Sequence, residues 1–312
     1  MIKKLPLTFF LFVIAIFSSP LSFCQSKKVL RTIIIDPGHG GLDQGAKGSY
    51  STEAEVSLAV SLKLGKAIEQ EFPDTKIIYT RTTDILPGNK TNKTDALRYR
   101  ADLANQSAGD LFIAIHCNAA PPIQHRHVIG HRTVMVKRKK KKIPTKVPVY
   151  KYWYTPNPAS GTETYIWAIS KSDDKVNSVS KIDDYGEVDS TSNITLPDPS
   201  DPVERSRMLV YAQNYFRKSL TFADLVEKGF QSQGRVYRGG VKQRNDKGIW
   251  VLQATGMPSV LVEIGFITSK EEEDYINSDK GQDEIVSNIV NALKNYKQKL
   301  ESRQLTDDKK AF

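Results

Sequence analysis

Apolar residues in this chain gather in short continuous runs that alternate with longer amphipathic stretches. The runs at 29–35, 111–115 and 259–264 are rich in Val, Ile and Leu and predict buried strands. Residues 53–71 and 204–230 carry apolar positions among good helix formers and predict helices. Strands that alternate with helices predict an α/β domain with a largely parallel central sheet flanked by helices.

Weaker patterns complete this domain. The stretch 271–300 predicts mostly helix, and the sequence contains no internal repeat. We therefore expect one domain over residues 29–300, followed by a charged tail at 301–312. The smaller predicted elements are strands at 76–80, 162–169 and 249–252 and a helix at 95–105.

The N-terminus has the features of an export signal. Two lysines precede a nearly all-apolar segment, 5–16, which is too short to span a bilayer comfortably. We expect residues 1–24 to be a signal peptide cleaved after Cys24, and the mature chain to be exported, periplasmic or secreted. Lipid anchoring at Cys24 fits less well, because Phe23 is bulky for the residue before an acylated cysteine. Cleavage leaves Cys117 as the only cysteine, which excludes an intrachain disulfide.

Charge separates one segment from the rest of the chain. The 312 residues include 45 Lys and Arg against 35 Asp and Glu, a net charge of +10. Residues 121–160 contain ten of the basic residues and no acidic ones, which leaves 35 of each sign elsewhere. Residues 171–205 contain nine acidic residues, four basic ones and three prolines, and predict a long loop. We therefore expect a long irregular insertion at about 121–205, basic in its first part (121–160) and acidic in its second (171–205).

This distribution argues against a nucleic-acid partner. The surplus charge is local, the remainder of the chain is neutral, and an exported protein does not meet the genome. The six consecutive basic residues 137–142 favour a weak, salt-sensitive association with anionic surfaces. His125, His127 and His131 lie in the same basic segment without a neighbouring carboxylate, so we do not expect a second metal site there.

The histidines that could do chemistry follow predicted strands directly. His39 lies in the run Asp36-Pro37-Gly38-His39-Gly40-Gly41 after the first strand, and His116 follows the strand at 111–115. Ligands gather at the carboxyl ends of the strands in an α/β sheet, so the two imidazoles could converge on one divalent ion. Zinc fits best, because it takes neutral imidazole and carboxylate ligands.

Two carboxylates complete this candidate site. Glu53 opens the helix after the glycine-rich loop and is the natural third ligand, although Glu55 competes with it. Glu263 ends an apolar run, where a carboxylate is costly without a partner or a task. It could take a proton from the attacking water and pass it to the leaving group. Structural roles are the alternatives: packing for the histidines, favouring a helix N-terminus for Glu53 and a buried ion pair for Glu263.

Several separate blocks, in this order, resemble the zinc-dependent N-acetylmuramoyl-L-alanine amidases of the type-3 amidase family. The similarity covers most of residues 29–300. Several blocks in the right order are far more specific than any single motif. The blocks are 35–41, 45–48, 53–58, 115–119, 161–164, 240–243 and 257–266, together with Leu97, Arg100, Ala104 and Asn105.

The resemblance implies that His39, Glu53 and His116 are the ligands of one zinc ion and that Glu263 is the catalytic residue. In the family a Lys follows the acidic ligand; that Lys is missing here, so Glu55 stays open as a ligand. The implied reaction is hydrolysis of the amide between the lactyl group of N-acetylmuramic acid and L-alanine, for cell-wall remodelling or cell separation. The implied partner is peptidoglycan; an activator protein is a further candidate partner, and the sequence leaves the need for one open.

Other functions fit parts of this pattern. A zinc peptidase of another specificity would keep the same residues, whereas a catalytically silent peptidoglycan-binding module would lose the zinc ligands or the base. All four residues are present, which favours an enzyme. Some family members carry a regulatory segment here, so one hypothesis is that part of 121–205 gates the cleft. A solvated insertion without a role is the alternative, and deletion of 171–200 would distinguish the two.

Overall fold

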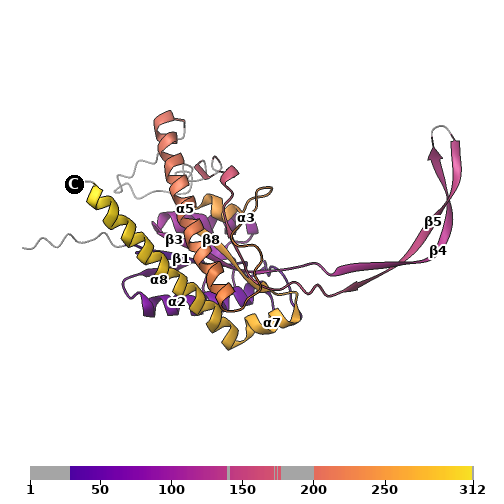
Figure 1. The fold of residues 1–312 in the computed structure, drawn as a ribbon, viewed down its shortest axis with the longest axis horizontal. Coiled ribbons are helices and arrows are strands. Elements are labelled where there is room, and N and C mark those ends of the chain that lie inside the picture. The colour runs from indigo at the N-terminus through magenta and orange to yellow at the C-terminus, as the bar shows by residue number, and fades with distance from the viewer. Residues whose placement is uncertain (1–28, 139–140, 172, 174, 177–199, 311–312) are drawn as a thin grey trace, which may run out of the picture.

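The computed structural model describes residues 29–138, 141–171, 173, 175–176 and 200–310 (Figure 1). The expected signal peptide, with Cys24, lies outside these residues. Most of the acidic part of the insertion also lies outside them, so the structure does not test the gating hypothesis. Within the described ranges, no helix is long and apolar enough to cross a membrane.

A six-stranded sheet forms the centre of the domain, in the order β2-β1-β3-β8-β6-β7. The first four strands in this order run parallel to one another, β6 is antiparallel to β8, and β7 is parallel to β6. The predicted α/β class with a largely parallel sheet is thus confirmed. The strands are β1 (Thr32–Pro37), β2 (Lys76–Tyr79), β3 (Leu111–Asn118), β6 (Glu163–Ile166), β7 (Lys242–Gln243) and β8 (Ser259–Phe266).

Helices cover both faces of this sheet. Helices α2 (Glu53–Glu71) and α8 (Asp279–Lys310) pack on one face with the second half of α5 (Pro202–Ser232). Helices α3 (Lys93–Gln106) and α6 (Trp250–Ala254) pack on the other with the first half of α5. Successive residues of each central strand serve the two faces alternately, which explains why these strands read as continuous apolar runs. The remaining helices are α7 (Lys270–Asn277) and the short turns Pro87–Asn89 and Ile169–Lys171.

Most predicted elements match the observed ones within a few residues, but the C-terminal third differs in two places. The predicted strand at 249–252 is wrong, because residues 250–252 belong to the short helix α6 and Ile249 is its N-cap. A run of four apolar residues has no period that separates a buried strand from one buried helical turn. Residues 301–310, expected as a charged tail, continue the backbone of α8.

Residues 123–155 form a two-stranded antiparallel ribbon that the sequence analysis did not predict. Strands β4 (Ile123–Arg138) and β5 (Lys141–Thr155) pair along their whole length, with a bulge between Val128 and Gly130. The ribbon extends far from the sheet and its helices (Figure 1). The prolines of β5 argued against a strand, but in a two-stranded ribbon every strand is an edge and tolerates proline.

Glu273 of α7 ties the loop before α2 to the C-terminal part of the domain. Its carboxylate accepts backbone hydrogen bonds from Ser49, Tyr50 and Ser51 at 2.7–2.9 Å, and one from the Ser51 hydroxyl at 2.8 Å. The Glu273 side chain is fully buried. Burial alone would raise its pKa, but these hydrogen bonds lower the pKa to about 2.

We expect the substitution Glu273→Gln to lower the free energy of unfolding by about 1–3 kcal/mol, because an amide nitrogen would replace one acceptor oxygen. The folded pKa lies below the unfolded value of about 4.3, so the carboxylate stabilises the fold above that pH. This contribution is lost as the pH falls toward 2. Urea unfolding at pH 7 and pH 2.5 should therefore show a difference from wild type that shrinks at the lower pH.

The matched control is Glu271→Gln, on the same helix but exposed. Its free energy of unfolding should stay within about 0.5 kcal/mol of wild type. An equal loss in both variants would contradict the role assigned to Glu273.

Candidate metal centre and cleft

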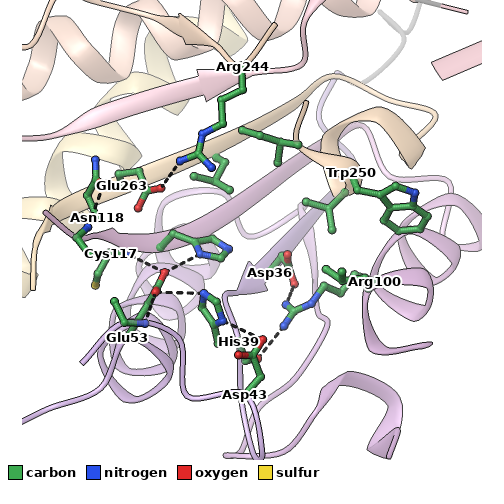
Figure 2. A pocket seen from close by; sticks show the side chains of 17 residues that line it. Asp36, His39, Asp43, Glu53, Arg100, Cys117, Asn118, Arg244, Trp250 and Glu263 are labelled. Carbon is green, nitrogen blue, oxygen red and sulfur yellow. Dashed lines mark hydrogen bonds and ion pairs between the residues drawn. The ribbon is translucent and has the colours of Figure 1, made fainter. Parts of the chain in front are cut away.

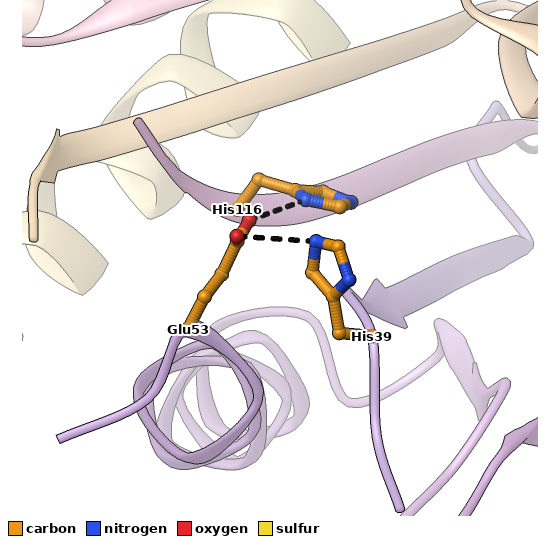
Figure 3. A group of neighbouring side chains, drawn as sticks. All are labelled: His39, Glu53 and His116. Atoms are coloured by element: carbon orange, nitrogen blue, oxygen red, sulfur yellow. Dashed lines mark hydrogen bonds and ion pairs between the residues drawn. The ribbon is translucent and has the colours of Figure 1, made fainter. Parts of the chain in front are cut away.

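Three potential metal ligands meet at the carboxyl ends of β1 and β3. His39 follows β1, His116 lies near the end of β3, and Glu53 is the first residue of α2. Their ligand atoms all lie within 4.8 Å of one another. Figure 3 shows both imidazole rings turned toward the carboxylate of Glu53. Nε2 of His39 is 3.1 Å from Oε2 of Glu53, and Nδ1 of His116 is 2.7 Å from Oε1.

Glu55 belongs to the N-terminal cap of α2 rather than to this group. Its carboxylate accepts hydrogen bonds from the backbone N–H and the hydroxyl of Thr52, both at 2.8 Å, and Thr52 caps the backbone N–H of Glu55 in return. Residues two positions apart on an α-helix differ in direction by about 200° around its axis, so Glu53 and Glu55 cannot face the same side. The structure therefore places Glu53, and not Glu55, beside the histidines.

Each carboxylate oxygen of Glu53 also has a backbone partner. Oε1 accepts a hydrogen bond from the N–H of Cys117 at 3.1 Å, and Oε2 accepts one from the N–H of Ala46 at 2.9 Å. Burial would raise the pKa of Glu53, but His116 and His39 hold it well below its usual value. The carboxylate is thus ionised and fixed in orientation.

Asp43 supports His39 from the side away from Glu53. Its Oδ2 lies 3.0 Å from Nδ1 of His39, and its Oδ1 lies 2.7 Å from Nζ of Lys93. Burial lowers the pKa of His39, but Glu53 and Asp43 outweigh it and raise the pKa above the usual value. A carboxylate behind a metal-binding imidazole is a common arrangement in zinc proteins. The donor set and its surroundings therefore fit a zinc ion.

The loop that carries His39 has an unusual backbone. His39 has a φ of 58°, in the left-handed region that few residues with side chains adopt. Its carbonyl accepts a hydrogen bond from Nη2 of Arg100 at 2.7 Å, and the carbonyl of Gly38 accepts one from Nη2 of Arg81 at 2.7 Å. A Cβ atom at Gly38 would lie 2.5 Å from the ring of His116, so only glycine fits there.

Buried charges stand behind this loop. Arg100 forms an ion pair with Asp36, the carboxylate near the end of β1, and Asp36 also accepts a hydrogen bond from the Thr80 hydroxyl. Both side chains of the ion pair are buried. Arg81 donates to backbone carbonyls, including that of Ala54 at 2.8 Å. Burial and the nearby Arg100 lower the pKa of Arg81 to about 10, so it keeps its charge at neutral pH.

Glu263 lies on β8, directly beside His116 in the sheet register. Its side chain is buried, and its Oε2 has no hydrogen-bond partner among the described residues. Burial raises the pKa of Glu263 to about 7, and the nearby carboxylates of Glu53 and Glu163 act in the same direction. Nη2 of Arg244 lies 3.9 Å from its Oε1. The group is therefore suited to gain and lose a proton near neutral pH.

The next strand carries a carboxylate in a very different environment. Glu163 of β6 pairs with Glu263 in the register and accepts hydrogen bonds from Nε of Arg238 and Nζ of Lys242, both at 2.6 Å. Burial would raise its pKa, but these contacts lower the pKa to about 2. Glu163 is thus a fixed anion that neutralises two cations beside the site.

The candidate ligands and Glu263 line one cleft of about 470 Å³ (Figure 2). Arg244 and Trp250 form further parts of its wall, and the guanidinium of Arg244 lies 4.9 Å from the centre of the Tyr165 ring. The cleft is open to solvent on the side of Arg244, whose side chain is 48% exposed. A substrate can therefore reach the histidines and Glu263 together.

Sequence reasoning missed several residues that position this site. It gave no role to Asp43 or Arg81, and it noted Arg100 only as part of a family resemblance. A signal for Arg81 was present, because it follows the end of β2 as His39 follows β1. Asp43 lies in the glycine-rich loop, where a short acidic side chain close to a histidine is a reason to test for a pair.

The family comparison covers most of the chain. The family model described as N-acetylmuramoyl-L-alanine amidase, of the type-3 amidases, matches residues 33–295. The chain is 28% identical over 269 residues to the N-acetylmuramoyl-L-alanine amidase AmiC of Escherichia coli. The matched region covers 85% of this chain and 52% of that protein. It is 24% identical to the germination-specific N-acetylmuramoyl-L-alanine amidase of Bacillus subtilis, over 89% of this chain and 83% of that protein.

A third relative, an uncharacterized cell wall amidase of Bacillus anthracis, is 25% identical over 85% of this chain and 35% of its own length. The chain therefore spans about a third of this relative and about half of AmiC.

Solved structures share the fold. The CwlD amidase of Clostridioides difficile, in complex with the GerS lipoprotein, superposes with a TM-score of 0.52 at 21% identity, over 85% of this chain and 98% of that one. Ami1 of Mycobacterium smegmatis gives a TM-score of 0.51 at 15% identity, over 88% of this chain and 100% of that one. At such identities the likeness concerns the fold alone. Because the family model spans most of its length, this chain belongs to the N-acetylmuramoyl-L-alanine amidase family.

Proposed function

We propose that this protein hydrolyses the amide bond between N-acetylmuramic acid and L-alanine in peptidoglycan, for cell-wall remodelling or cell separation. One zinc ion would be held by His39, Glu53 and His116, and Glu263 would transfer the proton. The observation that carries the proposal is the convergence of two imidazoles and a carboxylate with a buried carboxyl group in one open cleft. Membership of the amidase family supports the choice of bond.

Each residue of the site has a separate task in this proposal. Zinc, when bound, supplies a Lewis acid that polarises the scissile carbonyl and makes water more acidic. Glu263, with a pKa of about 7, accepts a proton from the attacking water and returns it to the departing amino group. The positive charge of Arg244 favours the ionised form of Glu263. Asp43 holds the ring of His39 in the orientation that presents Nε2 to the cleft.

We also propose that the enzyme acts outside the cytoplasm, where peptidoglycan lies, after export by residues 1–24. An activator protein remains a proposed partner. Its support is an analogy with the CwlD amidase, which forms a complex with the GerS lipoprotein and shares the fold.

The first prediction concerns the ligand set. Glu53→Gln should weaken zinc binding by more than about 100-fold, because it removes an anionic ligand that both histidines face. Titration of the metal-free protein with zinc, followed by calorimetry, measures the change.

Glu55→Gln is the matched control, two residues away on the same helix. It should keep the zinc affinity within about twofold, and it should keep the capping box, because a glutamine at this position can also reach the backbone N–H of Thr52. Wild-type zinc affinity in the Glu53→Gln variant would refute this ligand set.

The second prediction concerns the reaction. Wild-type enzyme with zinc should release free stem peptides that begin with L-alanine from purified peptidoglycan, as identified by mass spectrometry. Glu263→Gln should keep its zinc but lower the rate by about 10²–10⁴-fold, because the proton acceptor is gone. The exposed control variant Glu271→Gln should retain the wild-type rate.

Two results would count against the proposal in different ways. Cleavage at another peptide bond would replace the amidase with a zinc peptidase of another specificity. Full activity in Glu263→Gln would not contradict the proposed substrate, but it would show that Glu263 is not the proton acceptor.

A further inference from the structure

The ribbon of β4 and β5 presents positive charge that nothing on the ribbon neutralises. The segment 121–160 has ten basic residues and no Asp or Glu. The ribbon also projects away from the body of the domain, so among the described residues the acidic ones of the body lie far from most of it (Figure 1). The described basic side chains on the ribbon are all exposed; they are Arg126, Arg132, Lys137, Lys141, Lys142, Lys146 and Lys151.

The same ribbon exposes large apolar side chains. The strand register places Val134 opposite Thr145 and Val136 opposite Ile143, on one face of the ribbon. Val147 and Val149 follow on this face, because alternate residues of β5 point the same way. We call these five apolar residues, Val134, Val136, Ile143, Val147 and Val149, the aliphatic row. Within the row Ile143 is exposed and the four valines are half-buried. The other exposed apolar side chains on the ribbon are Ile123, Val128, Ile129, Met135, Tyr152, Trp153 and Tyr154.

A two-stranded ribbon of this kind has little stability of its own in water. Two strands alone bury neither face, and such hairpins are marginally stable unless a third element covers them. In the described part of the chain, the main contacts of β4 and β5 are with each other. Among the described residues, no third element packs on the half-buried aliphatic row, and no carboxylate of the ribbon neutralises its cations. These two features call for a surface that buries the row and neutralises the charges.

We propose that the ribbon binds the surface of an anionic lipid membrane. The aliphatic row faces the boundary of the acyl chains. The strand alternation places Arg132, Lys141 and Lys151 on the same face, where they reach the lipid phosphates along their flexible stems. Trp153, also on this face, is of a residue type that favours the membrane–water interface. A soluble anionic polymer would pair with the charges but would leave the aliphatic row in water, so the lipid surface accounts for both features.

This contact would determine where the enzyme works. Strands of 15 and 16 residues are roughly 50 Å long, so a ribbon that lies on the membrane keeps the attached body next to the membrane surface. The inference does not depend on the proposed hydrolysis, because it rests on the ribbon alone.

Co-sedimentation with vesicles tests the proposal. We would use the chain from Gln25 onward, so that the apolar segment 5–16 does not contribute to binding. The chain should bind vesicles of phosphatidylcholine and phosphatidylglycerol (3:1) and not vesicles of phosphatidylcholine alone. Each basic residue at an anionic membrane contributes about fivefold in affinity, so Arg132→Gln/Lys141→Gln/Lys151→Gln, on the face of the aliphatic row, should weaken binding roughly 100-fold.

The matched control changes the same number of charges on the body of the domain. Lys280→Gln/Lys294→Gln/Lys299→Gln, on α8, should bind the mixed vesicles within about threefold of wild type. Equal losses in the two triple variants would overturn the proposal, because binding would then follow net charge alone. Equal binding of wild type to neutral vesicles would overturn it as well.

A second variant separates lipid from polymer. Val134→Thr/Ile143→Thr/Val147→Thr keeps β-branched residues in the strands but removes aliphatic groups from the row. It should weaken vesicle binding about tenfold and leave binding to soluble polyphosphate unchanged, with a circular dichroism spectrum like that of wild type. Tight binding to polyphosphate, together with unchanged vesicle binding by this variant, would make a polymer the partner and refute the lipid surface.

Discussion

The candidate metal centre depends on two buried guanidinium groups that hold the loop after β1. Arg100 and Arg81 bind the successive carbonyls of this loop, and Asp36 balances the charge of Arg100. His39 needs this support, because its left-handed backbone is unfavourable without contacts that fix it. Removal of one partner from a buried ion pair costs about 3–5 kcal/mol, so the loop geometry is tied to the stability of the whole domain.

A single carboxylate then joins the separate parts of the site. Glu53 contacts both histidines and also accepts hydrogen bonds from the backbone of the glycine-rich loop and of β3. Binding of a metal at this point would therefore also fasten α2 to the two strand ends. The same sheet edge carries Glu163 and Glu263, neighbours with opposite surroundings. Two cations keep Glu163 ionised, whereas burial brings the pKa of Glu263 to about 7. Of the two neighbours, only Glu263 therefore changes its charge near neutral pH.

The sequence by itself predicted the fold class and three residues of the candidate site, His39, His116 and Glu263. Continuous apolar runs identified the central strands, because strands covered on both faces have no polar side. His39, His116 and Glu263 were recognisable because each lies at or near the end of such a run, and parallel strands bring their carboxyl ends to one edge. These features are local in the chain, or follow from topology alone.

Tertiary structure decided what depends on direction and on distant contacts. Glu53 and Glu55 are equally acidic and only two positions apart, and the packing of α2 decides which one faces the histidines. The sequence places Arg81 after the end of β2 but does not show that its side chain is buried, since the burial comes from carbonyls that other elements bring to it. The ribbon at 123–155 escaped prediction because its lysines and prolines disfavour strands, and only pairing between β4 and β5 makes strands of them. Local composition fixes none of these outcomes, because each requires a partner supplied by another part of the fold.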